Sequence, residues 1–340
     1  MIKSSQRMLI KLENKKNYTL EILKLFAAYM VVFIHIPFYG EFGNIIDALA
    51  RFAVPLFFLI SGFYSYNISL NKIKKRITNT MRLFIISSLI YTIWNIVNAL
   101  TDSNTENLAN YFNRYLSLKT IFNFLVLNIP VSSVHLWYIL ALLYVYAIFY
   151  FITKKKLKEK TFFRICAFLL IMNLILGEFL LAIGVNISVA VIRNFLFTGL
   201  PFFGFGILAK KYESKLASAK ASTILTLFAV GIAETLISRY LFGINEIYIG
   251  TILIISAFVV IFIKYSDKKY PKILISLANN STYIYILHII VILATLELIS
   301  AIAPAYQFSV AIQMIRPLIV CVISTILAYI VNGLTKKLKK

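Results

Sequence analysis

The sequence predicts an all-α membrane protein with ten transmembrane helices and both termini in the cytoplasm. Hydrophobic residues make up 60% of the 340 residues, and the mean hydropathy is +0.84. Runs of about eighteen or more apolar residues recur along the chain, and runs of that length are typical of helices that cross a bilayer. Clusters of lysine and arginine alternate regularly with these runs, which is the topology signal of a polytopic membrane protein.

Ten apolar runs are long enough to cross a membrane. The predicted spans cover residues 20–38, 45–67, 77–99, 134–152, 162–182, 190–209, 221–240, 247–264, 277–299 and 310–334. The stretch 120–130 is apolar but too short to span, so it is predicted as a short or re-entrant piece on the outer side. Pro55 interrupts the second span and Pro201 the sixth. Such breaks survive in a membrane only where protein or water satisfies the freed backbone groups.

The basic residues fix the expected orientation. They lie in the N-terminal tail, in every second loop and at the C-terminus, in clusters such as Lys72–Arg76 and Lys154–Arg164. Because cytoplasmic loops carry the excess of lysine and arginine, both termini are predicted to be cytoplasmic. The expected organisation is a basic tail over residues 1–17, a transmembrane domain over residues 18–335 and a second basic tail over residues 336–340.

Composition and spacing argue against several classes of protein and site. The net charge of +22 would suit a nucleic-acid partner, but the cations lie in short clusters between apolar runs, so membrane lipid is the expected partner. Cys166 and Cys321 lie inside apolar runs, and the three histidines are far apart, so neither a disulfide framework nor a metal is expected. The first apolar run is too long for a signal peptide and lacks a small-residue cleavage site, so it is expected to be retained.

The first predicted span carries the leading candidate site. Glu21, Lys24 and His35 lie within it, and ionisable groups inside a span are costly and therefore functional candidates. At about 100° per residue, Lys24 and His35 lie on one helix face, roughly 16 Å apart along the axis. Imidazole is the side chain best matched to neutral pH, so His35 is a candidate proton acceptor.

Ionisable residues from eight predicted spans share one depth, near the outer side. They are His35, Arg51, His135, Glu178, Arg193, Glu234, Arg239, Glu297 and Arg316. Arginines alone could extend to the lipid headgroups, but acids and histidines gain nothing from lipid. The set therefore predicts a polar cavity that opens outward and contains Arg–Glu pairs. Trp137 is either an interfacial aromatic residue or part of that pocket.

Four ordered motifs resemble the acyltransferase-3 membrane proteins, which include bacterial O-acetyltransferases of surface glycans. The first is a basic residue, ten residues and a histidine, here Lys24 and His35, with lysine in place of the more usual arginine. The others are the Pro-x-Phe-Phe-x-x-Ser-Gly-Phe stretch that begins at Pro55, His135–Tyr138 and Tyr283–His288. The resemblance covers nearly all of the chain.

The resemblance implies a multi-pass protein of the bacterial plasma membrane. It implies transfer of a small acyl group, acetyl in the first instance, from cytoplasmic acyl-CoA to a hydroxyl of an envelope glycan or related acceptor. His35 would be the base and Lys24 its donor-side partner, and no metal is implied. The residues expected to line the substrate site are Arg51, Ser61, His135, Trp137, Glu178, Arg193 and Glu234. Those expected to bind the donor are Lys24, Lys75, Arg76 and Arg82. The family's Arg-x-x-Arg pair is incomplete, because Asn79 stands three residues before Arg82.

The chain also resembles the membrane half of vancomycin-resistance serine racemases. The run that begins at Arg51 and the segment from Arg193 to Pro201 carry this second likeness. It implies a module that binds or imports L-serine, with the carboxylate on arginine and the ammonium on glutamate. On that alternative the chain would be one half of a split or truncated protein.

Overall fold

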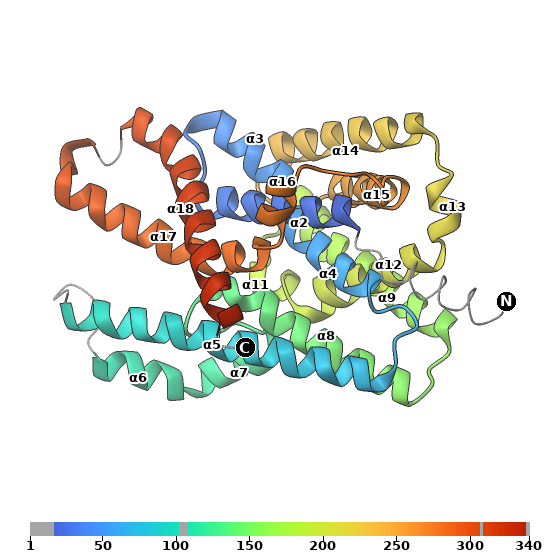
Figure 1. Ribbon diagram of the computed structural model, residues 1–340, viewed down its shortest axis with the longest axis horizontal. Coiled ribbons are helices and arrows are strands. Elements are labelled where there is room, and N and C mark those ends of the chain that lie inside the picture. The colour runs from blue at the N-terminus through green and yellow to red at the C-terminus, as the bar shows by residue number, and fades with distance from the viewer. Residues whose placement is uncertain (1–16, 102–107, 307–308, 338–340) are drawn as a thin grey trace.

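The computed structural model describes residues 17–101, 108–306 and 309–337, and within these ranges it contains helices and no strand. The predicted N-terminal basic tail lies outside the described residues except for Asn17. Residues 338–340 of the predicted C-terminal tail also lie outside the described residues. Figure 1 shows the helices as a bundle with α2 (Tyr18–His35) near its middle.

The elements follow the chain in a simple order. After α2 come α3 (Gly40–Ala50), α4 (Ala53–Phe63), α5 (Leu70–Thr101), α6 (Leu108–Leu116), α7 (Leu118–Val126), the 3₁₀ turn η1 (Val134–Leu136) and α8 (Trp137–Lys154). Next are α9 (Glu159–Leu174), the π-helical η2 (Ile175–Phe179), α10 (Leu180–Ala182), α11 (Val189–Ile192), the π-helical η3 (Phe195–Gly199), α12 (Leu200–Lys211) and α13 (Glu213–Ala217). The chain ends with α14 (Ala221–Phe242), α15 (Ile249–Lys264), α16 (Lys272–Ala278), α17 (Ser281–Ile302), η4 (Pro304–Tyr306) and α18 (Val310–Lys337).

Eight segments are long and apolar enough to cross a membrane among the residues described. The predicted sixth span, residues 190–209, is divided into α11, η3 and α12. The predicted eighth span is α15, which has 16 residues and is shorter than the roughly 20 that a perpendicular crossing needs. The prediction of an all-helical multi-pass membrane protein is therefore confirmed, whereas the count of ten spans remains a prediction.

Three helix boundaries differ from the expectation in ways that matter for the site. The second span runs from Gly40 to Phe63 rather than over residues 45–67, and it is divided between α3 and α4 at Arg51. Helix α5 begins at Leu70, so the basic cluster expected in a loop lies on its first turns. Helix α18 continues into the predicted C-terminal tail as far as Lys337.

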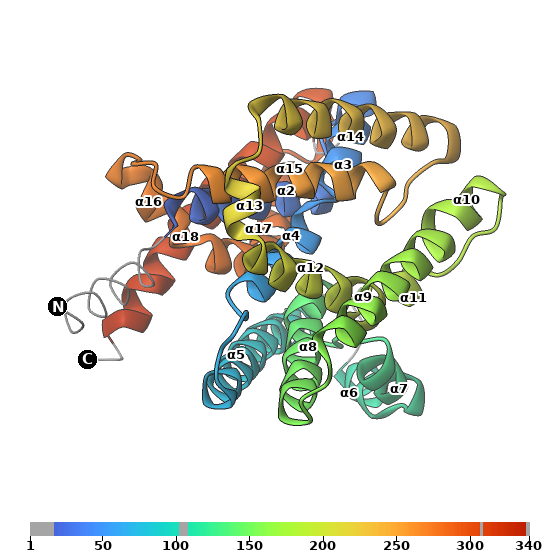
Figure 2. The same ribbon diagram turned by 90° about the vertical axis from the view of Figure 1, so that its right-hand side faces the viewer.

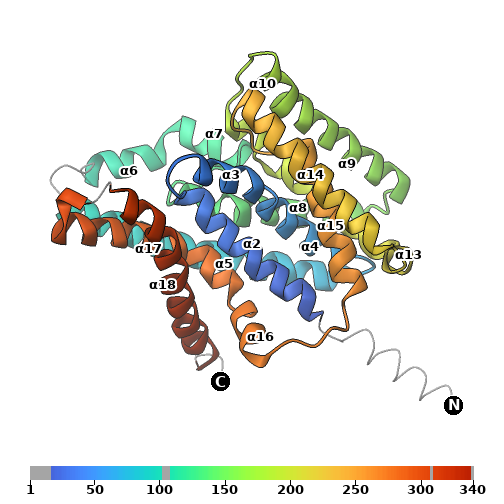
Figure 3. The same cartoon turned by 90° about the horizontal axis from the view of Figure 1, so that it is seen from above.

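Helix α2 is the central element of the bundle. It contacts α3, α4, α15, α16, α17 and α18, and Figures 1 and 2 show it surrounded by these helices. Its N-terminus is capped by the Asn17 side chain, which accepts from the Leu20 N–H at 3.0 Å. The two helices α6 and α7 lie beyond α5, away from α2 (Figure 1), and Figure 3 shows α17 and α18 side by side at one edge of the bundle. A helix packed on most sides carries its polar residues into protein rather than into lipid.

The helix ends that carry the basic clusters meet one another. Lys211 at the end of α12 pairs with Glu159 at the start of α9 at 2.7 Å. Lys264 at the end of α15 donates to the Ala219 carbonyl before α14 at 2.5 Å, and Thr19 donates to the Tyr265 carbonyl at 2.5 Å. These contacts gather the basic ends on one face of the bundle, as the alternation of charges in the sequence requires. The cytoplasmic location of that face remains a prediction.

Two glycines allow α4 and α12 to cross at backbone contact. A methyl group at Gly62 would overlap the Phe203 carbonyl, and one at Gly206 would overlap the Leu59 carbonyl. Small residues at a crossing let two membrane helices approach closely, and van der Waals packing then holds them together. This crossing fixes α4, which lines both cavities of the site described below.

We expect Gly62→Val and Gly206→Val each to destabilise the protein by about 1–3 kcal/mol, because backbone atoms cannot move aside for the added side chain. Thermal unfolding in detergent measures this effect. Gly333→Val is the matched control, since Gly333 is also helical but has open space around it. Equal melting temperatures for all three variants would contradict the close crossing.

Candidate functional site

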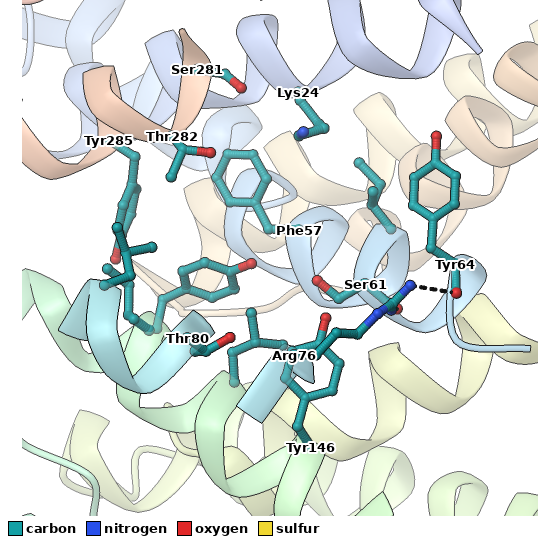
Figure 4. A pocket seen from close by; sticks show the side chains of 15 residues that line it. Lys24, Phe57, Ser61, Tyr64, Arg76, Thr80, Tyr146, Ser281, Thr282 and Tyr285 are labelled. Carbon is teal, nitrogen blue, oxygen red and sulfur yellow. Dashed lines mark hydrogen bonds between the residues drawn. The ribbon is translucent and has the colours of Figure 1, made fainter. Parts of the chain in front are cut away.

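The first cavity is formed between α2, α4, α5, α8 and α17. We call it the Lys24 cavity; its volume is about 310 Å³, which is within the range of small-molecule sites. Figure 4 shows Lys24 and Arg76 on different sides of the cavity, with Phe57 and Ser61 between them. Lys24 pairs with Glu21 at 3.2 Å. The cavity thus combines two cations with an aromatic and aliphatic lining.

Arg76 is held in place by neutral partners. Its guanidinium donates to the Ser65 hydroxyl at 2.7 Å, to the Tyr64 carbonyl at 2.7 Å and to the Ser61 carbonyl at 3.3 Å. Within the described part of the chain no carboxylate lies within ion-pair distance of it. Arg76 therefore lines the cavity as a cation that no described carboxylate neutralises, which suits an anionic ligand such as a phosphate.

The second cavity lies at the opposite end of α2. We call it the His35 cavity; it is narrow, about 40 Å³, and His35, Arg51, Trp137, Arg193 and Glu246 are among its lining residues. These residues come from five separate parts of the chain: the end of α2, the joint between α3 and α4, the start of α8, the break before η3 and the loop before α15. The predicted meeting of His35 with arginines from other segments is present in this cavity.

The charges of the His35 cavity are largely paired. Arg51 contacts Asp47 at 2.7 Å and Glu246 at 2.9 Å, and its side chain is 11% exposed. Arg193 lies 3.9 Å from Glu246 and 5.5 Å over the Trp137 ring, and it is 28% exposed. Arg51 is therefore a structural cation that joins α3 to the α14–α15 loop. Arg193 is the more open cation, and it lies on an aromatic face.

An asparagine-capped break in the helix positions Arg193. The Asn194 side chain accepts from the Leu196 and Phe197 N–H groups, each at 2.9 Å. Asn128 accepts from the Phe195 N–H at 2.9 Å, and Asn173 donates to the Phe197 carbonyl at 3.0 Å. These amides satisfy the backbone groups that the π-helical turn frees, which is the condition for a break at membrane depth. Arg193 stands at this break and extends toward Trp137.

All three histidines of the chain meet between the two cavities. The ring centroid of His288 lies 5.1 Å from that of His35 and 5.2 Å from that of His135, and the His35 and His135 centroids are 6.4 Å apart. His35 is exposed to its cavity, whereas His135 and His288 are buried. We call this set the histidine cluster. Among the described residues no group of histidine, cysteine or carboxylate side chains has metal-binding geometry.

Tyr285 connects the Lys24 cavity to the histidine cluster. Its ring lines that cavity, and its hydroxyl donates to the His135 carbonyl. Its own carbonyl is 2.7 Å from the Nδ1 of His288. The aromatic side chains of Phe57, Tyr138 and Tyr285 lie against one another at this end, with centroids 5.4–6.1 Å apart. Of these three rings, that of Tyr285 contacts the histidines, with centroids 6.0 Å from His135 and 5.9 Å from His288.

Two predicted substrate residues, Glu178 and Glu234, lie outside both cavities. Glu178 accepts from the Ile249 N–H at 2.8 Å, and Glu234 accepts from the Gly250 N–H and, at 3.0 Å, from the Ser238 hydroxyl. These N–H groups belong to the first turn of α15, where carboxylates are stabilised by unpaired backbone donors and by the helix dipole. Their positions fit a cap of α15. The carboxylate beside Arg193 in the His35 cavity is that of Glu246, at 3.9 Å, and not that of Glu234.

The other predicted residues divide between the two cavities and the outside. Ser61 lines the Lys24 cavity rather than the His35 cavity, and His135 is buried in the histidine cluster. Lys75 and Arg82 are exposed on α5 and do not line the Lys24 cavity. Glu297 is exposed, and Arg316 donates to the Ile292 carbonyl at 2.7 Å. The single polar pocket expected from nine ionisable residues is therefore smaller than predicted.

Sequence reasoning missed the acids that pair with the arginines. These acids are Asp47 and Glu246, and both contact Arg51. The spacing of Asp47 and Arg51, four residues apart on one helical face, was the available signal for the first pair. No local signal connects Arg51 to Glu246, because 195 residues separate them.

The fold and the site define a multi-pass membrane protein with two polar cavities joined through buried histidines. Comparison with protein families then identifies the chain: the model of the acyltransferase-3 family, described as an acyltransferase domain, matches residues 17–333, so the protein belongs to that family. No curated protein and no solved structure shows significant similarity to it. The family of membrane acyltransferases is thereby established, and the likeness to serine racemases is not shown.

Because Glu234 caps α15, we expect Glu234→Ala to lower the free energy of unfolding by about 1–3 kcal/mol through the loss of buried hydrogen bonds. Glu234→Gln keeps a carbonyl oxygen for the Gly250 N–H and should lose less. Thermal unfolding in detergent checks both, and ligand affinity measured on the folded protein should be unchanged. A loss of affinity with normal stability would return Glu234 to the substrate site.

Proposed function

We propose that the protein transfers a small acyl group, acetyl in the first instance, from acyl-CoA in the Lys24 cavity to a hydroxyl of a cell-envelope glycan or related acceptor in the His35 cavity. The observation that carries the proposal is the arrangement of the two cavities on either side of the histidine cluster. An acyltransferase that joins a cytoplasmic donor to an external acceptor needs such an arrangement. We further propose that the basic face of the bundle is cytoplasmic and that the membrane is the bacterial plasma membrane.

The donor side fits a thioester that carries phosphates. Arg76 offers a guanidinium without a carboxylate partner among the described residues, and Lys24 adds an ammonium on another wall. The lining between them is apolar and aromatic, through residues such as Phe57, Leu83 and Tyr146. Cations would bind the phosphates of the donor, and the apolar wall would hold its acyl end.

The reaction requires one base and no redox partner. As the acceptor hydroxyl gives its proton to His35, its oxygen attacks the thioester carbonyl carbon. The tetrahedral intermediate then collapses, the carbon–sulfur bond breaks, and the thiolate takes the proton from the imidazolium. The products are an ester and a free thiol, and His35 returns to its neutral form. Arg193 and Trp137 would orient the acceptor, because Arg193 is the more open cation of that cavity.

Removal of the base should abolish most of the activity. For His35→Ala we expect kcat to fall by about 10²–10⁴-fold, the usual contribution of a general base. The measurement is transfer of a labelled acetyl group from acetyl-CoA to purified cell-envelope glycan by the protein in liposomes. The control is Glu297→Gln, which removes an exposed ionisable group from α17 and should keep normal turnover. Full activity of His35→Ala would exclude His35 as the base.

The donor site can be tested with two neighbouring cations. Arg76→Ala should raise the KM for acetyl-CoA by roughly tenfold or more, because a charge-assisted contact to phosphate contributes more than a neutral one. Lys75→Ala is the matched control, since Lys75 is exposed and does not line the Lys24 cavity. Equal effects of the two substitutions would show that donor binding depends on the surface charge of α5 and not on this cavity.

A further inference from the structure

The buried histidines differ in the nitrogen atoms that remain free. His135 Nε2 lies 3.3 Å from the Ile286 carbonyl, which can only accept, so this nitrogen carries the proton. Its Nδ1 is then an acceptor for the Ser133 hydroxyl at 2.7 Å. Both ring nitrogens of His135 are therefore engaged. His135 has no nitrogen left for a substrate or for His35.

His288 has the opposite tautomer and one free nitrogen. Its Nδ1 lies 2.7 Å from the Tyr285 carbonyl and must donate to it. Its Nε2 is thus an acceptor, and this atom is buried without a hydrogen-bond partner in the described residues. The His288 side chain is 0% exposed. A buried acceptor without a partner costs free energy, so its retention calls for an explanation.

The candidate donor is the ring of His35, because the N–H of the equally close His135 ring is directed to the Ile286 carbonyl. The two ring centroids are 5.1 Å apart with planes at 43°, a separation at which nitrogens of the two rings that face each other lie within hydrogen-bond distance. His35 is open to its cavity, and His288 lies behind it in the protein. An imidazole that donates through one nitrogen presents the lone pair of the other, which is the form that a base needs.

We propose that His288 is the positioning residue for His35: its Nε2 accepts a hydrogen bond from the His35 ring and so holds the second His35 nitrogen, unprotonated, toward the acceptor hydroxyl. This inference rests on the proposed function, in which His35 is the base. His288 itself touches neither donor nor acceptor. Its contribution is to select the tautomer and orientation of His35, as the carboxylate partner of a catalytic histidine does in other enzymes.

A pair of substitutions separates this role from a structural one. In His288→Asn the side-chain amide replaces Nδ1 and still donates to the Tyr285 carbonyl, but nothing replaces Nε2. In His288→Gln the longer side chain restores an oxygen acceptor near the position of Nε2. We expect kcat to fall by about 10–100-fold in His288→Asn with both KM values within about twofold of the wild type, and partial recovery of kcat in His288→Gln.

A second measurement does not depend on turnover. Diethyl pyrocarbonate acylates unprotonated imidazole nitrogens, and His35 is the one exposed histidine of the three. Mass spectrometry of the intact membrane protein should show slower modification of His35 in His288→Asn than in the wild type, and a restored rate in His288→Gln. Ser324→Ala is the matched control, because it removes another fully buried polar group that has no hydrogen-bond partner among the described residues, on α18 and outside both cavities.

The outcomes distinguish the two proposals. If the wild type is inactive, the acyl-transfer function is refuted. If His35 is nevertheless modified fast in the wild type and more slowly in His288→Asn, the contact between the two histidines is retained. If the wild type is active, and His288→Asn has the same kcat and the same rate of His35 modification as the wild type, the positioning role alone is refuted. Equal losses in the Asn and Gln variants, together with lowered melting temperatures, would also refute it, because they would make His288 a packing residue.

Discussion

The architecture depends on one constraint: polar groups at membrane depth must find partners inside the protein, because lipid offers none. The Arg51 guanidinium meets this constraint through Asp47 and Glu246, and it thereby joins the α3–α4 joint to the loop before α15. Asparagines satisfy the backbone at the break beside Arg193, and Glu178 and Glu234 satisfy the first turn of α15. The break beside Arg193 and the first turn of α15 are thus each matched by polar side chains from other segments.

The Lys24 cavity, the histidine cluster and the His35 cavity follow one another through the bundle. The Lys24 cavity ends at the rings of Phe57, Tyr138 and Tyr285, and the histidine cluster lies beyond them. His35 opens on the other side to its own cavity. A donor and an acceptor that approach from opposite sides would meet at this thin partition. The acyl group would then cross the membrane barrier without either cavity being open to both sides.

The close helix crossings explain how so polar a centre remains ordered. Gly62 and Gly206 bring the α4 and α12 backbones into contact, and Gly231 and Gly250 do the same for α14 and α15. Both crossings act on segments that carry site residues: α4 lines the two cavities, and the turn before α15 supplies Glu246. Rigid packing at these points fixes the distances between charges, which a site on flexible loops would not do.

The sequence by itself determined the class of protein, the helical fold, the alternation of basic clusters and the position of Lys24 and His35 on one helix, because hydropathy, charge bias and helical spacing are local properties. It also placed His35, Arg51 and Arg193 at one depth. Only the tertiary structure decided that Glu178 and Glu234 cap a helix, that Glu246 meets Arg51 and that His288 lies behind His35. The depth of a residue in the membrane can be predicted from its own segment. Which residues its side chain contacts depends on how the helices pack against one another, and that is a property of the tertiary structure.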